Sequence, residues 1–253
     1  MTKRMPVVAA NWKMNGSREL VNDILLQIKQ SGVCQDIEVV ISPPATLYSY
    51  FDEQRKKQDL DHVFLAAQNI NELDSGALTG EISVGLAKES GCQWVICGHS
   101  ERRSLFKETS KVTAKKFMKA LNAGLKPILC VGETTEEKET GKTFSRLTAQ
   151  IEAVMHLGGK QAFKDCLIAY EPIWAVGTGE AASPELAQEI HRFIRGMIAS
   201  ICPETAKSVR ILYGGSVKPE NAAALFSQPD IDGGLIGGAG LVPEQFIKIC
   251  QMA

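Results

Sequence analysis

Glu171 is the residue whose position best suits acid–base chemistry. It directly follows the apolar run Leu167–Tyr170, and Pro172 then ends the strand that this run predicts. The next residues combine a large aromatic side chain, Trp174, with two glycines, which is typical of a loop that moves as a unit about fixed ends. The segment therefore predicts a general base beside a lid. A solvated carboxylate at an ordinary corner is the alternative that this segment leaves open.

Other polar side chains also follow apolar runs. Asn11 and Lys13 come after the first run of the chain. His99, Ser100 and Glu101 come after the fourth. Taken singly, Lys13 could be a surface charge and His99 a buried, hydrogen-bonded histidine. If a cation, an imidazole and a carboxylate meet at one face, however, they form the set needed to move a proton next to a carbonyl.

Two glycine-rich turns in the last third of the chain predict an anion site. They are Tyr213–Ser216 and Gly237–Gly240, the second of which shortly precedes a proline that can begin a helix. Glycines let backbone N–H groups approach a phosphate closely, and a helix N-terminus adds the favourable end of its dipole. Ser216, Gly237 and Gly238 are the candidate phosphate-binding residues, with plain tight turns as the alternative.

The elements that must position these residues are eight short apolar runs. They are Val7–Trp12, Glu38–Ile41, Val63–Ala67, Trp94–Cys97, Pro127–Val131, Leu167–Tyr170, Val209–Tyr213 and Gly234–Ile236. Because these runs are apolar on both alternating faces, they fit strands of a parallel sheet that is covered on both sides.

Segments with a helical period separate the apolar runs. One stripe begins at Leu20 behind the candidate N-cap Ser17, and another begins at Pro184 behind Ser183. Eight strand–helix repeats in 253 residues predict an α/β fold, a (β/α)₈ barrel of eight parallel strands ringed by helices. An open doubly wound sheet is the alternative. No linker divides the chain, so we expect one domain over residues 1–253.

Composition excludes several classes of protein. The net charge is −1 and no basic block occurs, so no nucleic-acid partner is expected. The apolar run Val7–Ala10 is too short for a signal-peptide core or a membrane span. The seven cysteines include no Cys-x-x-Cys pair and fit reduced residues of a cytoplasmic protein.

Metal and cofactor motifs are weak or missing. The sequence has no His-x-x-x-His pair and no acidic box, so we expect no metal. Gly177–Ala182 matches the glycine pattern of dinucleotide-binding folds and keeps a nicotinamide-dependent dehydrogenase open as an alternative. In that fold the glycines lead directly from a strand into a helix, whereas here Glu171–Val176 intervenes.

Several motifs together resemble one known family. They are Asn11–Gly16, Gly98–Arg103, Ala169–Gly179 and Tyr213–Ser216, with further matches in order at Gln68–Asn69, Gly76–Glu81 and Cys130–Thr134. From about residue 7 to its C-terminus the chain resembles the triosephosphate isomerase family. The resemblance implies a TIM barrel that interconverts dihydroxyacetone phosphate and D-glyceraldehyde 3-phosphate through an enediolate, in glycolysis and gluconeogenesis. It implies no cofactor and no metal.

The resemblance also implies catalytic roles, since the acid–base chemistry of this family is a standard example of how enzymes tune proton transfer. Glu171 would remove the proton next to the carbonyl. His99, kept neutral by the start of the following helix, would polarise the carbonyl and shuttle a proton. Lys13 would offset the developing negative charge, with Glu101 and Ser100 as supporting residues. The presence of Lys13, His99 and Glu171 together argues against a barrel that merely binds phosphate.

Substrate binding is implied for a further set of residues. Asn11 would orient the substrate oxygens together with Lys13. Gly177, Ser216, Gly237 and Gly238 would hold the phosphate through backbone N–H groups.

The loop Gly76–Glu81 resembles the family's protruding loop, in which Thr79 reaches the Asn11 region of a neighbouring subunit. A homodimer is therefore expected. Two residues depart from the family pattern: Gly240, where members usually carry serine, and Glu180, an acid at the distal end of the lid.

Overall fold

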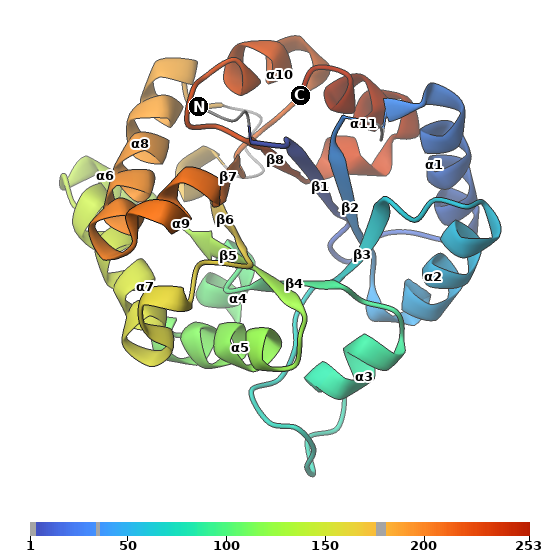
Figure 1. Cartoon of the computed structure of the whole chain (residues 1–253), viewed down its shortest axis with the longest axis horizontal. Coiled ribbons are helices and arrows are strands. Elements are labelled where there is room, and N and C mark those ends of the chain that lie inside the picture. The colour runs from blue at the N-terminus through green and yellow to red at the C-terminus, as the bar shows by residue number, and fades with distance from the viewer. Residues whose placement is uncertain (1–3, 34–35, 176–180) are drawn as a thin grey trace.

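Eight parallel strands close into a barrel in the computed structural model, which describes residues 4–33, 36–175 and 181–253 (Figure 1). The strands are β1 (Val7–Asn11), β2 (Glu38–Ser42), β3 (Val63–Ala67), β4 (Trp94–Cys97), β5 (Lys126–Val131), β6 (Leu167–Tyr170), β7 (Arg210–Tyr213) and β8 (Gly233–Ile236). Each strand pairs with its neighbours in sequence order, and β1 pairs with β8 to close the ring. The predicted (β/α)₈ barrel is confirmed.

Helices surround the barrel on its outer face (Figure 1). They are α1 (Arg18–Ser31), α2 (Tyr48–Lys57), α3 (Val84–Glu89), α4 (Ser100–Leu105), α5 (Ser110–Asn122), α6 (Thr135–Glu139), α7 (Thr143–Gly158), α8 (Pro184–Ile201), α9 (Pro203–Ser208), α10 (Pro219–Phe226) and α11 (Pro243–Cys250). Short 3₁₀ turns are η2 (Ala45–Leu47), η3 (Gly159–Gln161), η4 (Ile173–Ala175) and η5 (Gly238–Leu241). Ser17 caps α1 by accepting the N–H of Leu20, as predicted. Within the described ranges, no helix is long and apolar enough to cross a membrane.

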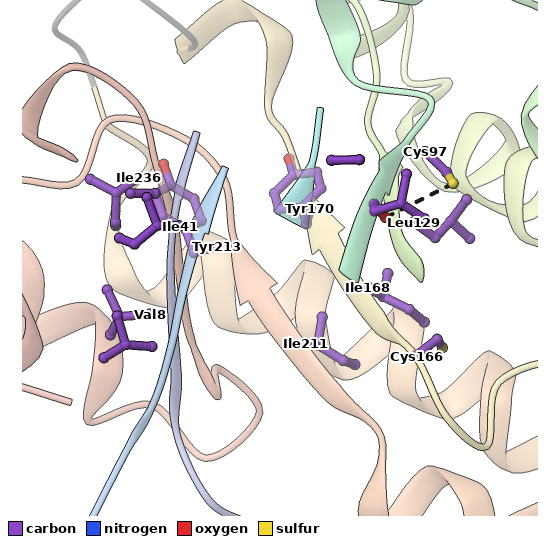
Figure 2. Close-up of a cluster of buried hydrophobic side chains, with 14 of the residues drawn as sticks. Val8, Ile41, Cys97, Leu129, Cys166, Ile168, Tyr170, Ile211, Tyr213 and Ile236 are labelled. Carbon is purple, nitrogen blue, oxygen red and sulfur yellow. Dashed lines mark hydrogen bonds between the residues drawn. The ribbon is translucent and has the colours of Figure 1, made fainter. Parts of the chain in front are cut away.

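Side chains on alternating strand positions fill two separate apolar layers. One cluster, in which Val7, Ala9 and Trp94 take part, collects side chains from one face of the strands. The larger cluster collects those from the other face together with the helices, and Figure 2 shows Val8, Ile168 and other members of it. Because both faces are buried, most positions of each strand are apolar, and the charged residues Glu38, Lys126 and Arg210 stand at strand starts. This explains why the eight runs could be recognised from the sequence.

His191 of α8 lies in the larger apolar layer, packed against two tyrosine rings. Its ring centroid is 5.9 Å from that of Tyr170 and 6.4 Å from that of Tyr213. Nδ1 lies 3.3 Å from the Asp230 carbonyl oxygen, which can only accept, so Nδ1 carries the proton of the neutral ring. Burial lowers the pKa of His191 from its ordinary 6.5 to about 3. The barrel therefore requires this histidine to be neutral.

We expect His191 to make the protein sensitive to acid. Between pH 6.5 and about 3 the unfolded chain binds the proton and the folded chain does not. The free energy of unfolding then falls as pH drops, by up to about 1.4 kcal/mol per pH unit. The variant His191→Asn keeps a donor for Asp230 but cannot be protonated. Urea unfolding at one protein concentration, from pH 7.5 to 4.5, should give a flatter dependence for the variant, and parallel curves would contradict the assignment.

Candidate active site

A cavity of about 660 Å³ opens at the carboxyl ends of the strands. Its lining includes the predicted residues Asn11, Lys13, His99, Glu171, Ser216, Gly237 and Gly238. Barrel enzymes place their sites at this end because the loops after the strands converge there. The structure therefore brings the acid–base residues and the glycine-rich turns into one space. Gly177, the remaining predicted phosphate ligand, lies outside the described residues.

Glu171 is buried at the end of β6, with 2% of its surface exposed. Its backbone N–H donates to the carbonyl oxygen of Val131 in β5 at 2.8 Å. Oε1 lies 2.8 Å from Nε2 of His99, and Oε2 accepts the backbone N–H of Ser100 at 2.9 Å. Burial raises the pKa of Glu171, but His99 and the N–H of Ser100 outweigh burial and hold it below its ordinary value. The carboxylate is ionised, as a base requires.

Gly214, after β7, leaves the room that the Glu171 side chain occupies. A Cβ atom at this position would lie 2.9 Å from Cγ of Glu171. The sequence placed Gly214 in a glycine-rich turn with a phosphate role, and its contact with Glu171 was not foreseen. The bare Cα of Gly214 thus helps to fix where the base lies.

His99 caps the N-terminus of α4 through its ring. Nδ1 accepts the backbone N–H of Glu101 at 3.3 Å, so a neutral ring carries its proton on Nε2, directed at Glu171. Burial lowers the pKa of His99, but the carboxylates of Glu171 and Glu101 together outweigh burial and the net shift is upward. These carboxylates therefore favour the protonated ring, whereas we expected the start of α4 to keep the ring neutral. The neutral role of His99 stays a prediction for a site in which substrate separates the two groups.

Lys13 holds a left-handed backbone conformation that is unusual outside glycine, with φ of 54°. Two neighbours brace it: Asn11 Oδ1 accepts the Lys13 N–H at 3.0 Å, and Gln68 Nε2 donates to the Lys13 carbonyl at 2.8 Å. Its Nζ lies 2.6 Å from Oε1 of Glu101, the supporting residue that we expected. Strained backbone maintained in this way is typical of functional sites. Gln68 is a positioning residue: the sequence motif Gln68–Asn69 matched the family, but the sequence predicted no role for Gln68.

Both glycine-rich turns line the cavity that Lys13 also lines. A Cβ at Gly237 would be 3.8 Å from Cε of Lys13. Gly238 begins η5, and the Gly240 N–H donates to the Gly237 carbonyl at 2.9 Å. On the other turn, the Ser216 carbonyl accepts Nδ2 of Asn221 at 3.0 Å. An anion in the cavity would therefore meet these turns near a lysine.

Glu133, which follows β5, anchors the start of the segment after Glu171. Its Oε1 accepts the Tyr170 hydroxyl at 3.0 Å and Nε1 of Trp174 at 2.8 Å, and burial raises the pKa of Glu133. Beyond the segment, the Ala182 N–H donates to the Tyr213 hydroxyl at 2.9 Å. Both ends are held by side chains that we had not assigned to the site. The predicted lid between them, including Glu180, lies outside the described residues.

In the part of the chain that the structure describes, no group of three or more His, Cys, Asp or Glu side chains could hold a metal ion. What the cavity does collect is a carboxylate, an imidazole and an ammonium group. The fold and the site together define a (β/α)₈-barrel enzyme equipped for acid–base chemistry at the carboxyl end of its strands.

Comparisons with known proteins then name the family. The family model for triosephosphate isomerase matches residues 6–253. A triosephosphate isomerase of Shewanella denitrificans is 47% identical over 260 residues, covering 100% of this chain and 99% of the relative. Those of Shewanella sp. strain W3-18-1 and Shewanella halifaxensis are 45% and 46% identical over 257 residues, with the same coverage. The chain belongs to the triosephosphate isomerase family.

Proposed function

We propose that the chain interconverts dihydroxyacetone phosphate and D-glyceraldehyde 3-phosphate, with Glu171, His99 and Lys13 as its catalytic residues. The observation that carries the assignment of roles is the 2.8 Å contact between Glu171 Oε1 and His99 Nε2 within a cavity that Lys13 also lines. The reaction is a step of glycolysis, and we propose that it takes place in the cytoplasm and in gluconeogenesis as well.

Each step moves one proton. Glu171 removes a proton from the carbon next to the carbonyl, and the electron pair of that C–H bond forms the enediolate. His99 polarises the carbonyl oxygen through its Nε2–H and transfers a proton between the two oxygens. Lys13 stabilises the negative charge that develops on them. Glu171 then returns its proton to the neighbouring carbon, which completes the isomerisation.

Substrate between Glu171 and His99 would change the protonation of the imidazole. The upward shift in the pKa of His99 comes from the carboxylate beside it, whereas burial acts in the opposite direction. A substrate oxygen that takes the place of Oε1 weakens the charge contact and leaves burial to favour the neutral ring. Asn11 and Lys13 orient the substrate oxygens, while Ser216, Gly237 and Gly238 donate N–H groups to the phosphate.

The direct test supplies purified protein with D-glyceraldehyde 3-phosphate and no added metal or cofactor. We expect dihydroxyacetone phosphate to accumulate until both isomers are at equilibrium. A fluorescence titration with NADH serves as the control, because tight nicotinamide binding would instead support a dehydrogenase. Absence of turnover under these conditions would overturn the proposal.

We further propose that two copies of the chain form a dimer through the loop Gly76–Glu81. This loop is exposed and projects from the barrel between β3 and α3 (Figure 1). Beside Lys13 lies a second cavity, of about 340 Å³, lined by Met14 and Phe106, whose exposed fractions are 95% and 66%. Exposed large apolar side chains that gather at one cavity are typical of an interaction surface. We infer that the loop of one copy packs against the cavity of the other.

The substitution Met14→Arg is expected to convert the dimer to a monomer, because it places a charge in the apolar surface that the partner would cover. Light scattering coupled to gel filtration measures the mass of each variant. Leu157→Arg is the matched control, since Leu157 is 54% exposed but lies at the end of α7, away from the loop and the second cavity. A Met14→Arg variant that keeps the dimer mass at micromolar concentration would exclude this interface.

A further inference from the structure

Gly240 faces Ala10 where the two ends of the barrel sheet meet. Ala10 belongs to β1 and pairs in register with Ile236 of β8, while Gly240 lies in η5, which begins two residues after the end of β8. Both residues are buried. A Cβ atom added to Gly240 would lie 2.9 Å from Cβ of Ala10, a separation that real Cβ atoms essentially never show.

Space, and not backbone conformation, requires glycine at this position. Gly240 is not among the glycines with positive φ, so an L-residue could adopt its backbone angles without strain. Of the other atoms near the added Cβ, Cα of Ala10 lies at 3.5 Å and Cβ of Ile236 at 3.9 Å, both ordinary contacts. The methyl group of Ala10 is therefore what fills the space in front of Gly240.

Ala10 and Gly240 form a contact between β1, which ends at Asn11 and leads to Lys13, and the glycine-rich turn Gly237–Gly240. Ala10 directly precedes Asn11, whose side chain braces the backbone of Lys13. Gly240 donates its N–H to the carbonyl of Gly237 at 2.9 Å. A shift of Gly240 away from Ala10 would thus move the turn Gly237–Gly238 relative to Lys13.

We propose that Ala10 and Gly240 are a size-matched pair that positions the turn Gly237–Gly238 against the end of β1, and thereby determines affinity for the phosphate group of the substrate. The proposal rests on the proposed function, in which this turn binds phosphate. A larger residue at 240 requires a smaller one at 10.

A double-mutant cycle tests the pair. Gly240→Ala is expected to raise KM for D-glyceraldehyde 3-phosphate about tenfold with kcat within about twofold, since Glu171 and His99 are untouched. Ala10→Gly should raise KM about threefold by opening a gap. The double variant Ala10→Gly, Gly240→Ala should return KM to within about twofold of the wild type. Gly196→Ala is the control, because a Cβ at Gly196 in α8 meets nothing within 4 Å.

The dissociation constant of inorganic phosphate, measured by calorimetry on the same variants, should follow the same pattern as KM. If both single variants keep the wild-type KM, or the double variant is no better than Gly240→Ala, the pairing is wrong. If Gly240→Ala does not fold, the double variant still decides, because the pairing requires it to fold and to bind phosphate like the wild type. A wild type without isomerase turnover whose phosphate affinity still follows the pair would refute the proposed function and leave the pairing intact.

Discussion

Replacing Glu171 with glutamine is expected to lower kcat about 10³-fold and to change KM little. General-base catalysis contributes about 10² to 10⁴ in rate, and an amide cannot accept the proton. The amide oxygen can still accept the N–H of Ser100, which the carboxylate accepts at 2.9 Å, so one of the two contacts that hold this side chain is kept. Initial rates with D-glyceraldehyde 3-phosphate over a range of concentrations separate the two constants.

A second variant tests whether the position of the carboxylate matters as well as its ability to accept a proton. Glu171→Asp keeps the carboxylate but shortens the side chain by one methylene, so kcat should fall far more than KM rises. Glu136→Gln removes a carboxylate from the first turn of α6, outside the cavity, and should leave both constants unchanged. A loss confined to KM in either Glu171 variant would mean that another group is the base.

The strands could be predicted from the sequence because each buried strand is a continuous run of mostly apolar residues. The run Leu167–Tyr170 coincides with β6, and Gly234–Ile236 falls one residue short of β8. The run Val7–Trp12 extends one residue beyond β1, although Trp12 still donates its N–H to Ser42 of β2 at 3.0 Å. Apolar side chains on both faces mark a strand wherever it lies in the barrel, so the type of element was predicted better than its ends.

The positioning residues could not be predicted because barrel closure brings them together. Gln68 braces Lys13 from 55 residues away, and Glu133 reaches Trp174 across 41 residues. No local spacing records either contact. The pKa of His99 has the same origin, since its upward shift depends on Glu171, the first residue after β6, lying beside His99, the second residue after β4. The candidate catalytic residues could be predicted from their positions at strand ends. Their orientation and protonation could not, because both depend on contacts that form only when the barrel closes.

Lys13→Met is expected to lower kcat/KM about 10²- to 10³-fold, the range typical of losing one charged or hydrogen-bonding group that stabilises a developing oxyanion. Methionine is unbranched like lysine and must bear the same left-handed backbone at this position, where φ is 54°. Glu101, the partner of Lys13, has a side chain that is 40% exposed and can be solvated when the ammonium group is lost. The variant should therefore fold, and its defect should be in catalysis.

The variant Glu101→Gln distinguishes the charge of Lys13 from its ion pair. It keeps the ammonium group in the cavity but replaces the carboxylate that lies 2.6 Å from Nζ. Because a partly exposed ion pair contributes little by itself, kcat/KM should fall by less than about tenfold. If Glu101→Gln were as damaging as Lys13→Met, placement of the lysine by Glu101 would matter more than its charge. If Lys13→Met kept wild-type kcat/KM, some other group would have to stabilise the enediolate.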